Sequence, residues 1–189
     1  MNITGDQKLV SKVPKRNKSY HEDEVLEALV KDPTRSAREI ANRLGSYRQK
    51  VWRRKKELER HNVIWGYTAV VDESKINHVL YMVMLKMKPM NKELAHLMAN
   101  RLLRHEPYKQ KVHLISALYV NGEYDLIIKF SAHDHTTARR YYDSLRVAYE
   151  KYLLAKPIIV DVNFQLVREG KTNPEIKKLY DFVPISTNS

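Results

Sequence analysis

The chain contains no cysteine among its 189 residues and only five glycines. The absence of cysteine excludes disulfides, thiolate nucleophiles and cysteine-ligated zinc, and nothing in the composition calls for an oxidising compartment. Neither a glycine-rich phosphate-binding loop nor the G-x-S-x-G elbow of serine hydrolases is present. No run approaches the roughly 20 apolar residues that cross a bilayer. These absences predict a cytoplasmic protein without cofactor, enzyme activity or membrane partner.

Positive charge is abundant. Thirty-four Lys and Arg against 22 Asp and Glu give a formal net charge of +12, an excess typical of proteins with a polyanionic partner. Ten of the basic residues lie between Arg35 and His61, with three Glu among them, so a net charge of +7 falls within one short stretch. This concentration indicates a localised nucleic-acid-binding surface.

Hydrophobic periodicity predicts a small helical domain at the start of the chain. Its three predicted helices cover residues 21–32, 36–45 and 47–61. Ser36 and Glu39 have the spacing of a capping box, in which each side chain satisfies the other residue's backbone amide. Asn62 follows the third helix where a left-handed conformation is needed, and Asn tolerates that conformation better than most residues. The pattern is that of a helix-turn-helix.

The third predicted helix has two distinct faces. Val51 and Leu58 share one side, and Gln49, Arg53, Lys56 and Arg60 lie within about 40° of the opposite direction, with no carboxylate among them. A recognition helix buries one face and offers the other to a DNA groove. The predicted DNA contacts are Arg35, Ser36, Arg38, Tyr47, Arg48, Gln49, Lys50, Arg53, Arg54, Lys56 and Arg60.

Depth along the helix predicts the role of each contact. The N-terminal part of a recognition helix normally enters the major groove. The residues predicted to contact base edges are therefore Arg48, Gln49, Lys50 and Arg53. Phosphate contacts are predicted for Arg35, Arg38, Arg54, Lys56 and Arg60. The alternative is a solvated helix with (i, i+4) pairs such as Arg53 with Glu57 or Lys55 with Glu59, which would leave most of the charge unneutralised.

The remainder of the chain has the pattern of a ferredoxin-like domain. Strands are predicted at residues 63–71, 79–87, 112–120, 124–130 and 157–167, and helices at residues 91–105 and 134–154. From residue 79 onward the order is βαββαβ. Asn121-Gly122 predicts a tight two-residue hairpin. The fold class is therefore α+β, with a helix-turn-helix (winged-helix-like) domain followed by a ferredoxin-like βαββαβ domain.

These elements predict five regions. They are a flexible basic arm (1–20), the helix-turn-helix domain (21–64), a linker strand and connection (65–77), the βαββαβ dimerisation and effector domain (78–168) and a polar C-terminal extension (169–189).

The sequence resembles the Lrp/AsnC, or feast/famine, family of transcription regulators. The resemblance is carried by SAREIANRLG at residues 36–45, by Val51, Arg53, Arg54 and Leu58-Glu59, by Asn62-Val-Ile-Trp-Gly-Tyr67, and by Gly122-Glu-Tyr-Asp125. It implies a homodimer, with assembly to tetramers or octamers left open, that binds double-stranded DNA. It also implies an amino-acid effector held near the hairpin by Asn121, Gly122, Tyr124 and Asp125. The segment Ala155–Asn163 lacks the Gly-Val pair and hydroxyls usual in the family, which predicts an altered or absent effector.

Three functions stay open at this stage. The favoured one is a sequence-specific transcription regulator acting as a dimer or higher oligomer. A nonspecific, nucleoid-associated DNA-coating protein would also suit the charge. Sirohaem decarboxylases share the two-part architecture but need no basic recognition helix. A metal site at His133-Asp-His135 is not predicted, because two imidazoles are too few and Asp134 is better placed as a helix cap.

Overall fold

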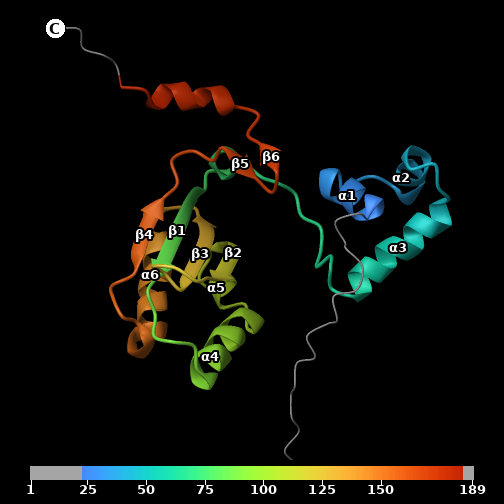
Figure 1. Cartoon of the computed structure of the whole chain (residues 1–189). Helices are drawn as coiled ribbons and strands as arrows, with labels where there is room; N and C mark the ends of the chain where they lie inside the picture. Colours follow the sequence, from blue (N-terminus) through green and yellow to red (C-terminus); the bar gives the residue numbers. More distant parts are fainter. Residues whose placement is uncertain (1–22, 185–189) are drawn as a thin grey trace, which may run out of the picture. The chain divides into compact units, whose positions relative to one another are not determined.

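The computed structural model describes residues 23–184 (Figure 1). The predicted basic arm, residues 1–20, lies outside the described residues. So do the first residues predicted for helix one and the last five of the predicted C-terminal extension. The chain divides into two compact units, Met1–Ala69 and Val70–Ser189, which we term the helical unit and the sheet unit.

The helical unit contains the three predicted helices, α1 (Glu24–Lys31), α2 (Ala37–Arg43) and α3 (Arg48–Arg60). The predicted capping box at the start of α2 is confirmed. Asn62 adopts the predicted left-handed conformation, with φ of 55°. The core joins the three helices through the buried side chains of Leu29, Ile40, Ala41 and Val51. The first helix is shorter than predicted because Asp23 caps it, accepting hydrogen bonds from the amides of residues 25 and 26.

The strand predicted at residues 63–71 is wrong. The segment contains no regular strand, and no strand among residues 23–184 pairs with it. It instead closes the end of α3, because the amides of Val63 and Ile64 donate to the carbonyl of Leu58 at 2.9 and 3.2 Å. Ile64 packs against the helical core. The β-branched and aromatic residues of this segment favour a strand only where a neighbouring strand is present to pack against them.

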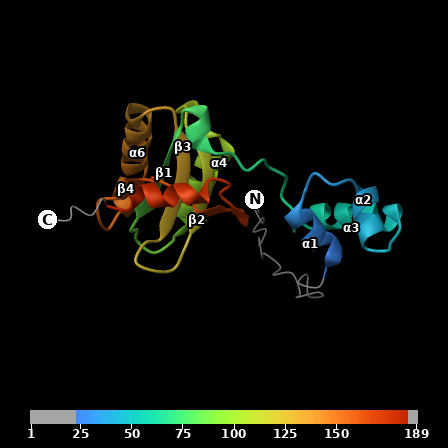
Figure 2. The same cartoon turned by 90° about the horizontal axis from the view of Figure 1, so that it is seen from above.

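The sheet unit has the predicted βαββαβ order. Its elements are β1 (Val79–Leu85), α4 (Lys92–Leu103), α5 (Glu106–Lys109), β2 (His113–Tyr119), β3 (Leu126–Ala132), α6 (His135–Tyr149) and β4 (Ile158–Asp161). The antiparallel sheet has the order β2-β3-β1-β4, and the strands and helices can be followed from a second direction in Figure 2. The ferredoxin-like fold is confirmed. The short helix α5 was not predicted.

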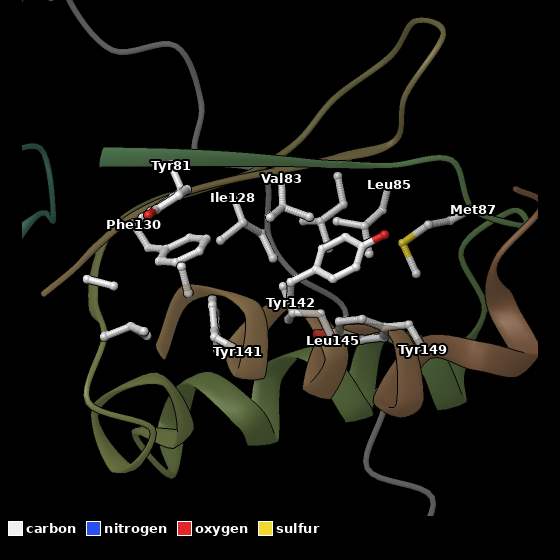
Figure 3. Close-up of a cluster of buried hydrophobic side chains, with 14 of the residues drawn as sticks. Tyr81, Val83, Leu85, Met87, Ile128, Phe130, Tyr141, Tyr142, Leu145 and Tyr149 are labelled. Carbon is white, nitrogen blue, oxygen red and sulfur yellow. The ribbon is translucent and has the colours of Figure 1, made fainter. Parts of the chain in front are cut away.

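One face of the sheet forms the core with α4 and α6. Figure 3 shows Tyr81, Val83 and Phe130 pointing from the strands toward the residues of α6. Phe130 is fully buried, 4.7 Å from Tyr141 in a T-shaped arrangement and 5.5 Å from Tyr81 between ring centroids. The hydroxyl of Tyr142 donates to the carbonyl of Pro157 at 2.7 Å, which joins α6 to the start of β4.

The tight hairpin predicted at Asn121-Gly122 is wrong. Residues 120–125 form a longer loop between β2 and β3, and Gly122 is not among the residues with positive φ. Asp125 explains the length of the loop. Its amide donates to the carbonyl of Leu85 at 2.9 Å, and its Oδ2 accepts from the amide of Met87 at 2.6 Å. These bonds fasten the loop to the end of β1, which a two-residue turn could not reach.

The last predicted strand, residues 157–167, is shorter in the structure. β4 ends at Asp161, and the chain continues into a hairpin of β5 (Val167–Arg168) and β6 (Lys171–Thr172) and a 3-10 helix, η4 (Ile176–Phe182). Arg168 pairs with Glu73 in the 3-10 helix η2 (Glu73–Ile76). Lys75 and Lys178 contact Glu175 at 2.9 and 2.6 Å, and their hydrogen bonds lower its pKa to about 2. Much of the predicted polar extension is thus ordered on the sheet unit.

Across residues 23–184, no helix combines the length and the apolar character that crossing a membrane requires.

Candidate nucleic-acid interface

The helix α3 has the two predicted faces. Val51 and Leu58 are each 1% exposed and hold the helix on its scaffold. The opposite side, which we term the basic stripe, consists of Gln49, Arg53, Lys56 and Arg60, and all four are exposed. The helix therefore presents a cationic surface, and the side chains of the stripe do not pack against the core of the helical unit. DNA contact through the stripe stays a prediction.

Most cations at this surface have no acidic partner. Within the part of the chain that the structure describes, no carboxylate forms an ion pair with Arg38, Arg48, Lys50, Arg53 or Arg60. Lys56 is the exception in the stripe, since its Nζ lies 2.8 Å from Glu59 Oε2. That hydrogen bond holds the pKa of Glu59 below its usual value. The (i, i+4) pairs considered above do not form, and the charge remains largely unneutralised.

Arg54, for which a phosphate contact is predicted, forms two ion pairs inside the helical unit, and its contact with DNA stays a prediction. Its Nε donates to Asp23 Oδ2 at 2.6 Å, and its Nη1 donates to Glu57 Oε2 at the same distance. The hydrogen bonds to Glu57 and Asp23 raise the pKa of Arg54. Asp23 is also the cap of α1, and its side chain is 9% exposed. Arg54 therefore joins α3 to the start of α1.

The start of α2 is organised by its cap. Ser36 donates its amide and its hydroxyl to Glu39 Oε2, both at 2.7 Å, and these hydrogen bonds lower the pKa of Glu39. Arg35 donates from Nε to Asp32 Oδ2 at 2.9 Å. Its Nη1 is buried and has no hydrogen-bond partner among the described residues. Of the residues predicted here, Arg38 is the cation exposed to solvent without an internal bond.

Aromatic side chains flank the basic surface. Tyr47, the residue before α3, is 82% exposed, and Trp65 is 94% exposed with its indole donating to the carbonyl of Asn62 at 2.8 Å. Tyr67 donates from its hydroxyl to Glu59 Oε1 at 3.3 Å, and the Nζ of Lys55 lies 4.6 Å from its ring centroid. Sequence analysis missed the contacts of Tyr67, because they depend on the chain folding back along α3.

The residues predicted to bind an effector lie at one loop. Asn121 and Gly122 are exposed, whereas Tyr124 and Asp125 are half-buried. The carboxylate of Asp125 is used within the fold, on the amide of Met87. The loop therefore offers mainly the exposed pair to a ligand.

The His133-Asp-His135 segment is used for helix capping, as predicted. Asp134 accepts from the amide of Thr137 at 2.6 Å, and Nδ1 of His135 is hydrogen-bonded to the hydroxyl of Tyr81 at 2.8 Å. Among residues 23–184, no group of three or more His, Asp or Glu side chains is arranged to hold a metal ion.

Residues 24–64 match the family described as winged helix-turn-helix DNA-binding. No curated protein matches the chain in sequence. Solved structures share its fold. The leucine response regulatory protein of Mycobacterium tuberculosis is 17% identical, covers 80% of this chain and 96% of its own length, and gives a TM-score of 0.61. An AsnC family transcriptional regulator from Agrobacterium tumefaciens is 16% identical over 84% of this chain and 98% of its own, with a TM-score of 0.58.

A transcriptional regulator from Neisseria meningitidis, solved as a complex with L-Met, is 16% identical over 80% of this chain and 94% of its own, with a TM-score of 0.61. Identities of this size establish a shared fold. The predicted resemblance to the Lrp/AsnC regulators is confirmed at the level of the fold.

Proposed function

We propose that this chain, a winged helix-turn-helix DNA-binding module joined to a ferredoxin-like domain in the fold of the Lrp/AsnC regulators, is a transcription regulator and not an enzyme. The observation that carries the proposal is the basic stripe on α3, exposed opposite Val51 and Leu58 and free of acidic side chains. A regulator of this kind acts on the chromosome in the cytoplasm. Nothing in the described residues favours a decarboxylase.

The proposed regulator is a homodimer formed through the sheet unit. The face of the sheet opposite α4 and α6 carries Met82, Met84, Ile127, Ile158 and Val160, together with Lys129 and Ser131. Ile158 and Val160 are 42% and 39% exposed, whereas Met82, Met84 and Ile127 are half-buried. Exposed apolar side chains that gather on one face of a sheet are typical of an interface. Two copies related by a two-fold axis would bury this face against itself and place two helix-turn-helix modules on the two halves of an inverted repeat.

In sedimentation equilibrium, the chain is expected to show about twice its monomer mass of 22.3 kDa, or an even multiple of it. Met84→Lys would place a charge in the centre of the proposed interface and is expected to shift the protein toward the monomer. The matched control is Met90→Lys, at an exposed position outside the strands, which should leave the mass unchanged. A monomer in the unsubstituted chain at micromolar concentration would contradict the proposed dimer.

Two substitutions on α3 distinguish contacts with DNA bases from contacts with the DNA phosphates. Sites selected from random DNA are expected to contain an inverted repeat. On such a site, Arg53→Ala should lower the affinity by about 1–3 kcal/mol and relax the preference at one base, whereas Arg60→Ala should weaken all DNA about equally. Binding is measured by titration of labelled duplexes at fixed salt.

If Arg53→Ala binds the selected site as tightly as the parent chain, the assignment of α3 as the recognition helix is wrong. Selection that returns no common sequence would instead favour the nonspecific coating protein.

Effector control is the finer part of the proposal. The L-Met complex belongs to a neighbour in fold, and of the four residues predicted to bind an effector, Asn121 and Gly122 are exposed. Repeating the site selection with single amino acids tests this role. An unchanged footprint with every amino acid would leave the loop a purely structural feature.

A further inference from the structure

A cavity that opens to the surface lies between the sheet and the helices of the sheet unit. Its volume is about 140 Å³, and its walls come from α4, α5, β2, β3 and α6. Most of the lining is apolar, with Met98 from α4, Leu114 from β2, Ile128 from β3 and Leu145 from α6. Apolar cavities of about 150 Å³ hold one benzene molecule. The space therefore fits a single six-membered ring.

A buried hydroxyl interrupts this apolar lining. Tyr141 is 2% exposed and lines the cavity, and none of the hydrogen bonds found among the described residues involves its hydroxyl. Its neighbour Tyr142, by contrast, donates to a backbone carbonyl. Burial raises the pKa of Tyr141 to about 12, so the group is a neutral donor near neutral pH. The Tyr141 oxygen is not among the fully enclosed atoms that lack a partner in residues 23–184, so it borders the open cavity and is available to a ligand.

An arginine stands beside that hydroxyl. Arg101 lines the cavity, its guanidinium lies 5.7 Å from the ring centroid of Tyr149, and its charge opposes the rise in the pKa of Tyr141. No carboxylate among residues 23–184 forms an ion pair with Arg101. The same residue also lines an open groove with Arg104 on the outer side of α4. The guanidinium therefore sits where the cavity meets the surface.

We propose that this cavity binds a small aromatic monocarboxylate of about the size of benzoate. Its ring fills the apolar space, and its carboxylate pairs with Arg101 and accepts a hydrogen bond from Tyr141. Guanidinium groups bind carboxylates through charge-assisted hydrogen bonds. None of the described residues that line the cavity is acidic, so the ammonium group of an amino acid would be left unpaired. No residue of loop 120–125 lines the cavity, and the site is independent of both DNA binding and the loop.

Three small ligands, compared on the unsubstituted chain, test the proposal without any substitution. In isothermal titration, benzoate is expected to bind, and benzylamine and L-phenylalanine are expected to bind at least about tenfold more weakly because each carries an ammonium group. Absence of benzoate binding at millimolar concentration, or equal binding of benzylamine, would overturn the proposal.

Substitutions then locate the site. Tyr141→Phe should weaken benzoate about tenfold, and Arg101→Met, which keeps the side-chain bulk, should weaken it by about tenfold or more. Ala117→Leu enlarges a cavity-lining side chain from β2 and should abolish binding. Arg104→Met removes a charge from the groove outside the cavity and should leave the affinity unchanged. Benzoate binding that survives both Ala117→Leu and Arg101→Met would place the ligand elsewhere and refute the assignment.

Discussion

Replacing Arg53, Lys56 and Arg60 together with glutamine is expected to weaken binding to double-stranded DNA by about a hundredfold or more at about 0.15 M salt. The three side chains are exposed on one side of α3, and two of them have no ion pair among the described residues. Each contact to a phosphate that is lost should reduce the slope of log K against log salt by about 0.9. Fluorescence anisotropy with a labelled duplex at several salt concentrations measures both quantities.

The control variant has the same net charge as the α3 variant, but the three positive charges are removed from a different part of the chain. Neutralising Lys92, Lys109 and Lys156, which are exposed in the sheet unit, also removes three positive charges from the formal +12. It should change affinity and salt slope little, because only charges within a Debye length of about 8 Å of the DNA contribute strongly. If the control weakens DNA binding as much as the α3 variant, binding follows overall charge and the localised interface is wrong.

The faces of α3 could be predicted because they follow from local rules. Val51 and Leu58 recur at helical spacing, and the polar side chains between them must point the other way. The capping box of Ser36 and Glu39 is likewise local, since both partners lie within one turn of the chain. The βαββαβ order also follows from alternating helix and strand periods. Such features depend on neighbours in sequence.

The errors all involve partners distant in sequence. The loop at residues 120–125 is set by the bonds of Asp125 to the end of β1, which outweigh the turn preference of Asn-Gly. The segment 63–71 has strand-forming residues but no strand beside it. In each case tertiary contacts decided the outcome, and sequence spacing could not reveal them.

Phe130→Ala is expected to destabilise the sheet unit by about 3–5 kcal/mol. The ring is fully buried at the centre of β3 and contacts Tyr81 on one side and Tyr141 on the other. Truncation removes its transfer free energy, leaves a cavity between sheet and helix, and loses two aromatic contacts of about 0.5–1.5 kcal/mol each, which that range already contains. Hydrogen exchange of the slowest amides in β1 and β3 measures the effect, and their protection should fall by at least about a hundredfold.

Tyr180→Ala is the matched control, because Tyr180 is also aromatic and in the sheet unit but is 77% exposed on η4. Its effect should stay within about 0.5 kcal/mol, as expected for a surface position. The comparison separates loss of an aromatic ring from loss of buried packing. If Phe130→Ala reduces the protection of the β3 amides less than tenfold, the surrounding side chains collapse into the space, and Phe130 does not hold the sheet on α6 as its contacts imply.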